Sequence, residues 1–171
     1  GGVFSLEAYP LPSTIDYIRQ ELGDPNAIGI IEVDDKQKVI GFGWGYPISP
    51  EKFTDHKYKR PETREAILGA YRAAGFKPTD PMFYISEVGV VSGDQRRGIG
   101  TRMTFEIAEH GRGRGYGLHL RTSRNSSMNR IATRLGMRGI VGPDCAVKDA
   151  ENGDRIIFVC RKEELVKPSL R

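Results

Sequence analysis

The residues best placed to do chemistry are Gln95-Arg96-Arg97-Gly98-Ile99-Gly100, a basic segment with two glycines one residue apart. An apolar run at 82–91, typical of a strand, precedes this segment. A helical pattern over 98–110 follows it, with apolar residues repeating at Ile99, Met103 and Ile107. The sequence therefore places a basic, glycine-bearing turn between a strand and the start of an amphipathic helix.

Such a turn can bind phosphate. The first N–H groups of a helix have no acceptor within the helix, and the helix start carries about half a positive charge. Gly98 and Gly100 lack the side chains that would keep an anion from those donors, and Arg96 and Arg97 add positive charge at the rim. We therefore predict an anion site built mostly from backbone.

Two other glycine-rich segments are weaker candidates. Residues 41–45 lie inside a predicted strand, whereas a nucleotide-binding loop follows a strand. Residues 111–117 alternate glycine with arginine, as some nucleic-acid-binding segments do, but Tyr116 is the only aromatic residue there that could stack on a base. We expect 111–117 to be a turn from a helix to a strand, and we do not expect nucleic acid as a partner.

Composition and charge set the broad class. The chain has 171 residues, 38% hydrophobic and 28% charged, which favours one soluble globular domain. Residues 1–94 hold 10 Lys and Arg against 14 Asp and Glu, whereas residues 95–171 hold 16 against 8. The basic second half suits a ligand rich in phosphate, although a solvated basic surface would have the same composition.

No apolar run is long enough to cross a bilayer, and no secretory leader is visible, so we expect a cytoplasmic protein without a membrane segment. Cys145 and Cys160 are not in a metal-binding spacing and the three histidines are scattered, so we expect reduced thiols and no metal site. The chain begins Gly1-Gly2 without Met, so whether the natural chain extends upstream stays open.

The elements around the turn define a fold class. A strand, helix and strand in succession predict one parallel crossover, and paired strands elsewhere predict antiparallel neighbours. We predict an α/β fold with a mixed, mostly antiparallel sheet, a central parallel β-α-β crossover and helices on both faces. Residues 48–81, rich in proline and charge, read as an insertion with one helix at 61–74. The other predicted elements are strands at 27–33, 39–47, 117–122 and 154–161, a helix at 126–135, and a helix at 13–22 with Ile15, Ile18 and Leu22 on one apolar face.

Gln95-x-x-Gly98-x-Gly100 matches the Gln/Arg-x-x-Gly-x-Gly/Ala motif of the GNAT superfamily of N-acetyltransferases. Residues 85–90 resemble that family's strand before the motif, and 117–125 resemble the strand and turn after it. The resemblance covers roughly 27–161 and is poor over 48–81. It implies one acetyltransferase-like domain over 1–171, with the insertion as an acceptor-site lid. The family's first strand and helix have no counterpart in residues 1–12, so we expect a shortened start or further chain upstream.

The resemblance implies acetyl-CoA as the acetyl donor, with its pyrophosphate in the predicted anion site. In the family, backbone near Val88 and Val90 would hold the pantetheine arm, and Asn125 matches an asparagine that contacts the cofactor. The residues that the resemblance implies for cofactor binding are Val88, Val90, Gln95, Arg96, Arg97, Gly98, Ile99, Gly100, Thr101 and Asn125.

Acetyl transfer to an amine needs a base, because an alkylammonium with a pKa near 10.4 is almost fully protonated at pH 7. Reaching the neutral amine costs roughly 4 to 5 kcal/mol. Glu87 lies on the strand that leads to the anion site, and many family members carry a glutamate on this strand. We predict Glu87 as the proton acceptor, with a rim carboxylate paired to an arginine as the alternative.

The family's usual acid is missing. Its members commonly carry a tyrosine seven residues after the asparagine, to protonate the leaving thiolate, and that position here is Ala132. Water, Tyr84 or Tyr116 could serve instead, although both tyrosines could equally be packing residues.

Two classes of function remain from the sequence. The first is an N-acetyltransferase acting by direct attack of a primary amine, on a small molecule or a peptide. The second is a non-catalytic module that binds CoA as a sensor, which the missing tyrosine favours. The acceptor is not fixed by the sequence, and a homodimer stays open.

Overall fold

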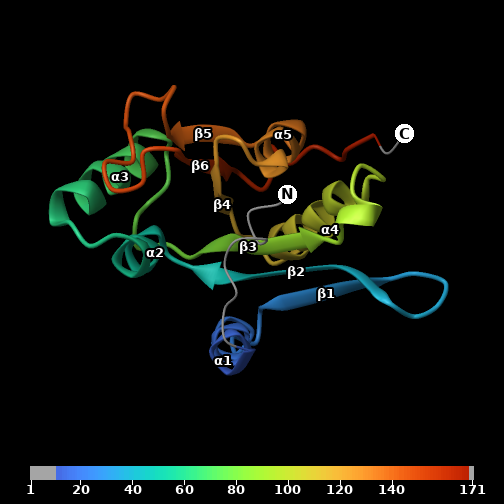
Figure 1. Ribbon diagram of the computed structural model, residues 1–171. Coiled ribbons are helices and arrows are strands. Elements are labelled where there is room, and N and C mark those ends of the chain that lie inside the picture. The colour runs from blue at the N-terminus through green and yellow to red at the C-terminus, as the bar shows by residue number, and fades with distance from the viewer. Residues whose placement is uncertain (1–10, 170–171) are drawn as a thin grey trace.

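The computed structural model describes residues 11–169. Its centre is a sheet in the order β1-β2-β3-β4-β6-β5 (Figure 1). The strands are β1 (Ile28–Val33), β2 (Val39–Ile48), β3 (Met82–Val90), β4 (Leu118–Ser123), β5 (Arg138–Val141) and β6 (Arg155–Cys160). The helices are α1 (Leu11–Glu21), α2 (Pro50–Lys57), α3 (Pro61–Ala73), α4 (Ile99–Gly113) and α5 (Ser127–Arg134), with a 3₁₀ turn, η2, at Ser92–Asp94.

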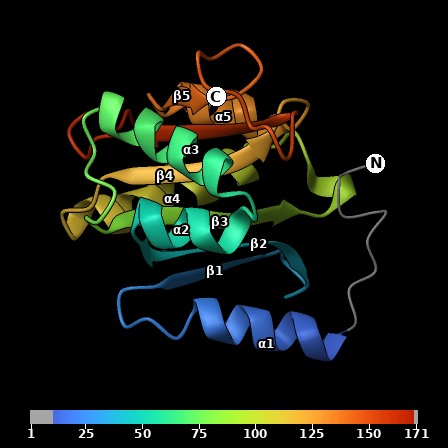
Figure 2. The ribbon, with the colours of Figure 1, turned by 90° about the vertical axis from the view of Figure 1, so that its left-hand side faces the viewer.

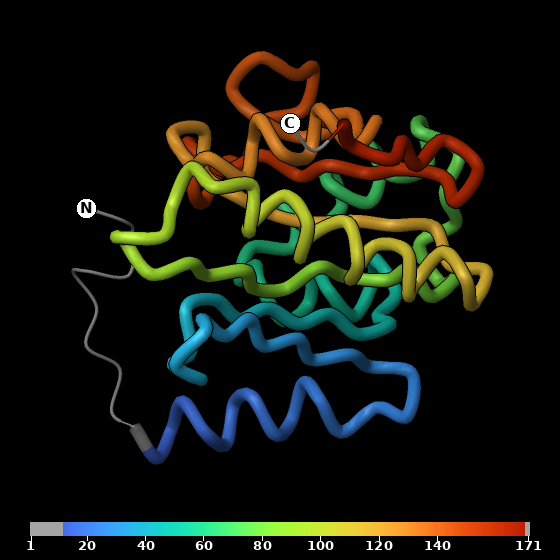
Figure 3. Tube along the Cα trace, turned by 90° about the vertical axis from the view of Figure 1, so that its right-hand side faces the viewer, coloured from blue at the N-terminus to red at the C-terminus, as the bar shows by residue number. Residues whose placement is uncertain are grey.

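The predicted fold class is confirmed. β3 and β4 are parallel and α4 connects them, whereas the other neighbouring strands are antiparallel. Helices cover both faces: α2 and α3 lie on the face turned toward the viewer in Figure 2, and α4 lies in front of the opposite face in Figure 3. The sequence predicts no counterpart of the family's first strand and helix in residues 1–12. Residues 1–10 of this segment lie outside the described part of the chain. No helix of residues 11–169 is long and apolar enough to cross a membrane.

The segment 48–81 contains two helices where the sequence predicted one. The first, α2, has the usual start signals: the Ser49 side chain accepts a hydrogen bond from the backbone N–H of Lys52 (3.3 Å), and Pro50 occupies the first turn. The proline-rich pattern of 48–81 predicted no helix at Pro50, although proline is well tolerated at the first position of a helix. The four-residue strand β5 was also missed, because it is too short for a pattern to be visible.

The insertion forms part of the core. Phe53 of α2 and Ile67 and Tyr71 of α3 are fully buried against β3, β4 and β6. The Tyr71 hydroxyl also lies 2.8 Å from Nδ1 of the buried His119 on β4. Removing the α3 helix would therefore expose a large part of the core. Point substitutions are the suitable test of whether the insertion contributes to the acceptor site.

α4 packs closely on the sheet because glycines face it. A Cβ at Gly43 would lie 3.0 Å from Ile107 of α4, and one at Gly45 would lie 2.8 Å from the same side chain. These positions explain why glycines alternate along β2: the face they leave bare receives α4.

We expect Gly111→Ala to destabilise the protein by about 1–3 kcal/mol, because a Cβ at Gly111 of α4 would lie 2.4 Å from the Phe83 ring, and overpacking at this level forces helix and strand apart. Gly113→Ala is the matched control, since a Cβ there meets nothing within 4 Å. Urea unfolding measures both. Equal stability of the two variants would contradict this packing.

Candidate active site

β3 and β4 are paired over only part of their length. The parallel pairing joins Phe83–Ile85 to Leu118–Leu120, whereas β3 continues to Val90 and β4 to Ser123. Beyond Ile85, the edge of β3 that faces β4 has no partner strand in the described chain. Backbone groups on this edge, apart from the Val90 carbonyl, which accepts from Gln95, are therefore free to bind an extended ligand. This opening leads to the turn at 92–98 and the start of α4.

A β-bulge sets the direction of the Glu87 side chain. Glu87 lies opposite Trp44 and Ile85 lies opposite Gly45, so Ser86 is an extra residue in β3. Without it, Glu87 would point to the same face as Ile85, which α4 covers. The bulge instead turns Glu87 to the face of Trp44, toward α1 and α2.

The Glu87 carboxylate is partly buried and has no hydrogen-bond or ion-pair partner within residues 11–169. Burial, and then the negative charge of Glu21, raises the pKa of Glu87 to about 7, while Lys57 and Arg155 limit the rise. A carboxyl group with this pKa is about half ionised at neutral pH, which is where a general base is most effective. No arginine forms an ion pair with Glu87 within residues 11–169, although Arg155 acts on it electrostatically.

Glu21 is the buried carboxylate beside it. Glu21 is 8% exposed and accepts hydrogen bonds from Trp44 Nε1 (2.6 Å), the Tyr46 hydroxyl (2.8 Å) and Ser86 Oγ (2.7 Å). The apolar residues predicted to anchor α1 are partly exposed instead, with Ile15 38% and Leu22 37% exposed. A polar network thus holds α1 against the sheet, and one of its members is the bulge residue.

Glu21 was not predicted as a site residue. Its one signal is position: a glutamate in the last turn of a helix opposes the helix dipole, and Glu21 lies three residues after Ile18, on the predicted apolar face. Such a residue needs a tertiary partner, but the sequence does not say that Trp44, Tyr46 and Ser86 supply it.

We expect Glu21→Gln to lower the pKa of Glu87, because the variant removes the nearby negative charge that raises it. The pH at which activity reaches half its maximum should move below about 7. Stability should also fall by about 1–3 kcal/mol, since glutamine cannot accept all three hydrogen bonds. A pH–rate profile measures the shift, and an unchanged midpoint would contradict the coupling.

The turn before α4 exposes backbone donors. Arg96 and Gly98 have φ values of 64° and 80°, in the left-handed region, and Gly98 is the N-cap of α4. The backbone N–H groups of residues 95–101 donate to no acceptor in the described part of the chain. Consecutive free N–H groups in such a turn form a concavity that binds anions, and the helix start adds its positive end.

Side chains of the same segment hold the turn in shape. Gln95 Nε2 donates to the Val90 carbonyl oxygen (3.1 Å), and Arg97 pairs with Asp94 (2.5 Å). Ile99 is buried against Ile40 and Met103. Of the predicted anion-site side chains, only that of Arg96 is exposed and has no partner within residues 11–169.

Space for a ligand surrounds the glycines. A Cβ at Gly98 would meet nothing within 4 Å, and one at Gly100 would lie 3.6 Å from Val90 and 3.7 Å from Ile131 of α5. The end of β3, the start of α4 and the middle of α5 therefore converge at Gly100. Thr101 follows in the first turn of α4, and Asn125 lies exposed in the turn between β4 and α5.

The solvent face of α5 carries an open hollow of about 500 Å³, lined by Asn129, Arg130, Thr133 and Arg134. Neither arginine forms an ion pair within the described residues. Part of the positive charge of the basic second half is therefore free here to interact with an anionic ligand.

Three positions bear on the missing acid. Ala132 is completely buried in the core, so its position offers no polar group to the opening. Tyr116 packs on Phe83, near the beginning of β3 and away from Glu87. Tyr84 shares a face of the sheet with Glu87, and burial raises its pKa well above the ordinary value, so its hydroxyl stays protonated.

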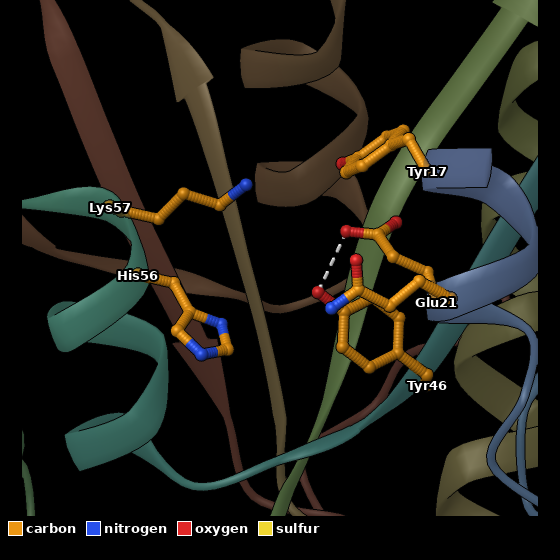
Figure 4. A pocket seen from close by; sticks show the side chains of 6 residues that line it. Tyr17, Glu21, Tyr46, His56 and Lys57 are labelled. Atoms are coloured by element: carbon orange, nitrogen blue, oxygen red, sulfur yellow. Dashed lines mark hydrogen bonds between the residues drawn. The ribbon is translucent and has the colours of Figure 1, made fainter. Parts of the chain in front are cut away.

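A second hollow, of about 440 Å³, lies on the face to which Glu87 points. α1, β2 and α2 all contribute to it, and Figure 4 shows side chains from α1 and α2 converging on it. The residues that line it are Tyr17, Gln20, Glu21, Tyr46, His56 and Lys57. None of these six was singled out from the sequence.

Comparison with known proteins identifies the family of this chain. Residues 4–137 match the family model described as the acetyltransferase (GNAT) family. The chain therefore belongs to this family, as the motif at 95–100 predicted, and it is an acyl-CoA-dependent acetyltransferase. No curated protein sequence matches it significantly.

Solved structures share the fold at low sequence identity. A polyamine N-acetyltransferase of Drosophila melanogaster is 14% identical, with a TM-score of 0.60 over 91% of this chain and 83% of that one. NAA60 of Arabidopsis thaliana, solved with acetyl-CoA, is 16% identical, with a TM-score of 0.56 over 85% and 82%. Naa20 of Chaetomium thermophilum, solved with a bisubstrate analogue, is 17% identical, with a TM-score of 0.56 over 96% and 79%. At these identities the similarity shows the fold alone.

Proposed function

We propose that this protein transfers the acetyl group of acetyl-CoA to a primary amine, by direct attack of the neutral amine on the thioester. The observation that carries the proposal is the unpaired Glu87 carboxylate, with a pKa of about 7, on the strand that ends at the free N–H groups of 95–101. When bound, acetyl-CoA supplies an activated acyl group. Everything else that the reaction needs has to come from the chain.

The residues present fit that donor. The free N–H groups of 95–101 and the exposed Arg96 would hold the pyrophosphate, because together they present several donors and positive charge. The unpaired edge of β3 near Val88 and Val90 would hold the pantetheine arm through backbone hydrogen bonds. Thr101, in the first turn of α4, and Asn125, exposed in the turn before α5, would also contact the cofactor.

Glu87 would remove the proton from the acceptor ammonium, directly or through water. Backbone N–H groups of the open β3 edge would polarise the thioester carbonyl as negative charge develops on its oxygen. Water would return a proton to the thiolate, because Tyr84 is 4% exposed in the core and burial raises its pKa, which makes it a weaker acid. The insertion at 48–81 would shape the acceptor side, since it contributes His56 and Lys57 to the hollow of Figure 4.

The alternative, a CoA-binding sensor without catalysis, is favoured by one observation: Ala132 occupies the position of the family's tyrosine and is fully buried. An acetyl-CoA consumption assay across amines of different class separates the two functions. Thiol release matched by acetylated amine supports the transferase. Tight CoA binding without transfer to any amine supports the sensor.

A further inference from the structure

Lys57 is a positive charge at the edge of the second hollow. It ends α2, is partly buried, and places its Nζ 6.0 Å from the centre of the Tyr17 ring. Figure 4 shows its side chain extending from α2 toward Tyr17 and Glu21 of α1. Within residues 11–169 its ammonium group forms no ion pair and no hydrogen bond. Apart from the Tyr17 ring, the three N–H donors of this group at the hollow have no partner within these residues, which is an arrangement that suits an anion.

The neighbouring charges on this face are already engaged. Arg121 donates to the Tyr58 hydroxyl (3.0 Å) and lies 3.6 Å from Asp149. Arg155 lies 3.8 Å from Asp154. Glu21, the only carboxylate among the residues lining the hollow, accepts three hydrogen bonds and has little capacity for more.

What remains unpaired is Lys57 on one side and Glu87 on the other. Lys57 acts electrostatically on Glu87, which points to the same face of the sheet as Tyr46 of the hollow. His56 lies on the same wall as Lys57 and offers ring nitrogens to the same ligand. A substrate that matches this surface has two groups of opposite charge, an ammonium and an anion.

We infer that the acceptor amine carries an anionic group, a carboxylate or a phosphate, which pairs with Lys57 while the amine faces Glu87. This inference rests on the proposed function. It selects a small zwitterionic acceptor over a polyamine, because the second ammonium of a polyamine would meet the ammonium of Lys57 and be repelled. The acidic first half of the chain, which by itself favours any cation, does not make this distinction.

The test uses acceptors matched in length: a series of ω-amino acids, their carboxamides and the corresponding diamines, with phosphoethanolamine against ethanolamine as the phosphate arm. We expect kcat/KM for the best anionic acceptor to exceed that of its neutral match about tenfold, a typical effect of one charge-assisted contact. Lys57→Met should abolish this preference, and Lys57→Glu should reverse it in favour of the diamine. Lys52→Met, an exposed lysine of the same helix outside the hollow, should leave it unchanged.

A wild-type preference for carboxamides or diamines, or a ratio that Lys57→Met leaves unchanged, would overturn the inference while the transferase stands. Mass spectrometry that finds an acetyl group on Lys57 itself would also overturn it, because Lys57 would then be an acceptor. If no amine is acetylated, the proposed function fails, and calorimetry on the CoA-bound protein still decides: tighter binding of the amino acid than of its amide, lost in Lys57→Met, supports the inference, and equal binding refutes it.

Discussion

Replacing Glu87 with glutamine is expected to lower kcat for amine acetylation at pH 7 by about 10² or more, which is the usual contribution of a positioned general base. Glutamine keeps the size of the side chain and removes its ability to accept a proton. In the wild type, kcat/KM should rise with pH through about 7, because the raised pKa means that the basic form appears only there. The variant should lose this inflection and recover part of its rate at high pH, where more of the acceptor is already neutral.

Stability provides the control for Glu87→Gln. Because the pKa of Glu87 is raised in the folded state, its contribution to stability is present at low pH and is lost as the pH rises through about 7. Glutamine has no such loss, so the variant should be at least as stable as the wild type at pH 8. Glu62→Gln, on the exposed start of α3, is a matched substitution that should change neither rate nor profile. A Glu87→Gln enzyme with the wild-type rate and profile would leave positioning as the only source of catalysis.

The second large effect is expected at Gly100. Gly100→Leu should weaken acetyl-CoA binding about 100-fold or more, since the side chain would extend from the gap between Val90 and Ile131 over the free N–H groups that bind phosphate. The fold should tolerate the change, because a Cβ there makes ordinary contacts at 3.6 and 3.7 Å and leucine favours helix over glycine by up to about 1 kcal/mol. Calorimetric titration measures the affinity.

Gly69→Leu is the control for bulk on a helix. Gly69 lies in α3, and a Cβ there meets nothing within 4 Å. This variant should bind acetyl-CoA as the wild type does. If Gly100→Leu also retained the wild-type affinity, the turn at 95–101 would not be the phosphate site.

The parts of the fold that were predictable are those with a local signal. Glycine spacing and charge predict the turn at 95–100, and apolar periodicity predicts β3, α4 and β4. The parallel crossover and the family could therefore both be predicted from the sequence. α2 was not predicted, because the proline that begins it, Pro50, is also typical of a segment without regular secondary structure.

The parts of the site that could not be predicted depend on contacts distant in the sequence. Whether Glu87 points toward α4 or toward the acceptor side depends on the extra residue Ser86, and a bulge is visible only when β3 is paired with β2. Glu21 lies 65 residues from Ser86 along the chain, yet the two share a hydrogen bond. Lys57 is unremarkable in the sequence and becomes notable only because its neighbours on that face are engaged and it is not.

The most direct test of the central claim is a quantitative transfer assay in which released CoA thiol and acetylated amine are measured together, for the wild type and for Glu87→Gln. The account predicts that the wild type forms the two products in equal amounts with at least one primary amine, and that Glu87→Gln retains acetyl-CoA affinity while losing most of the transfer at pH 7. Thiol release that never exceeds the amine-free background, across all amine classes and with acetyl-CoA bound, would contradict it.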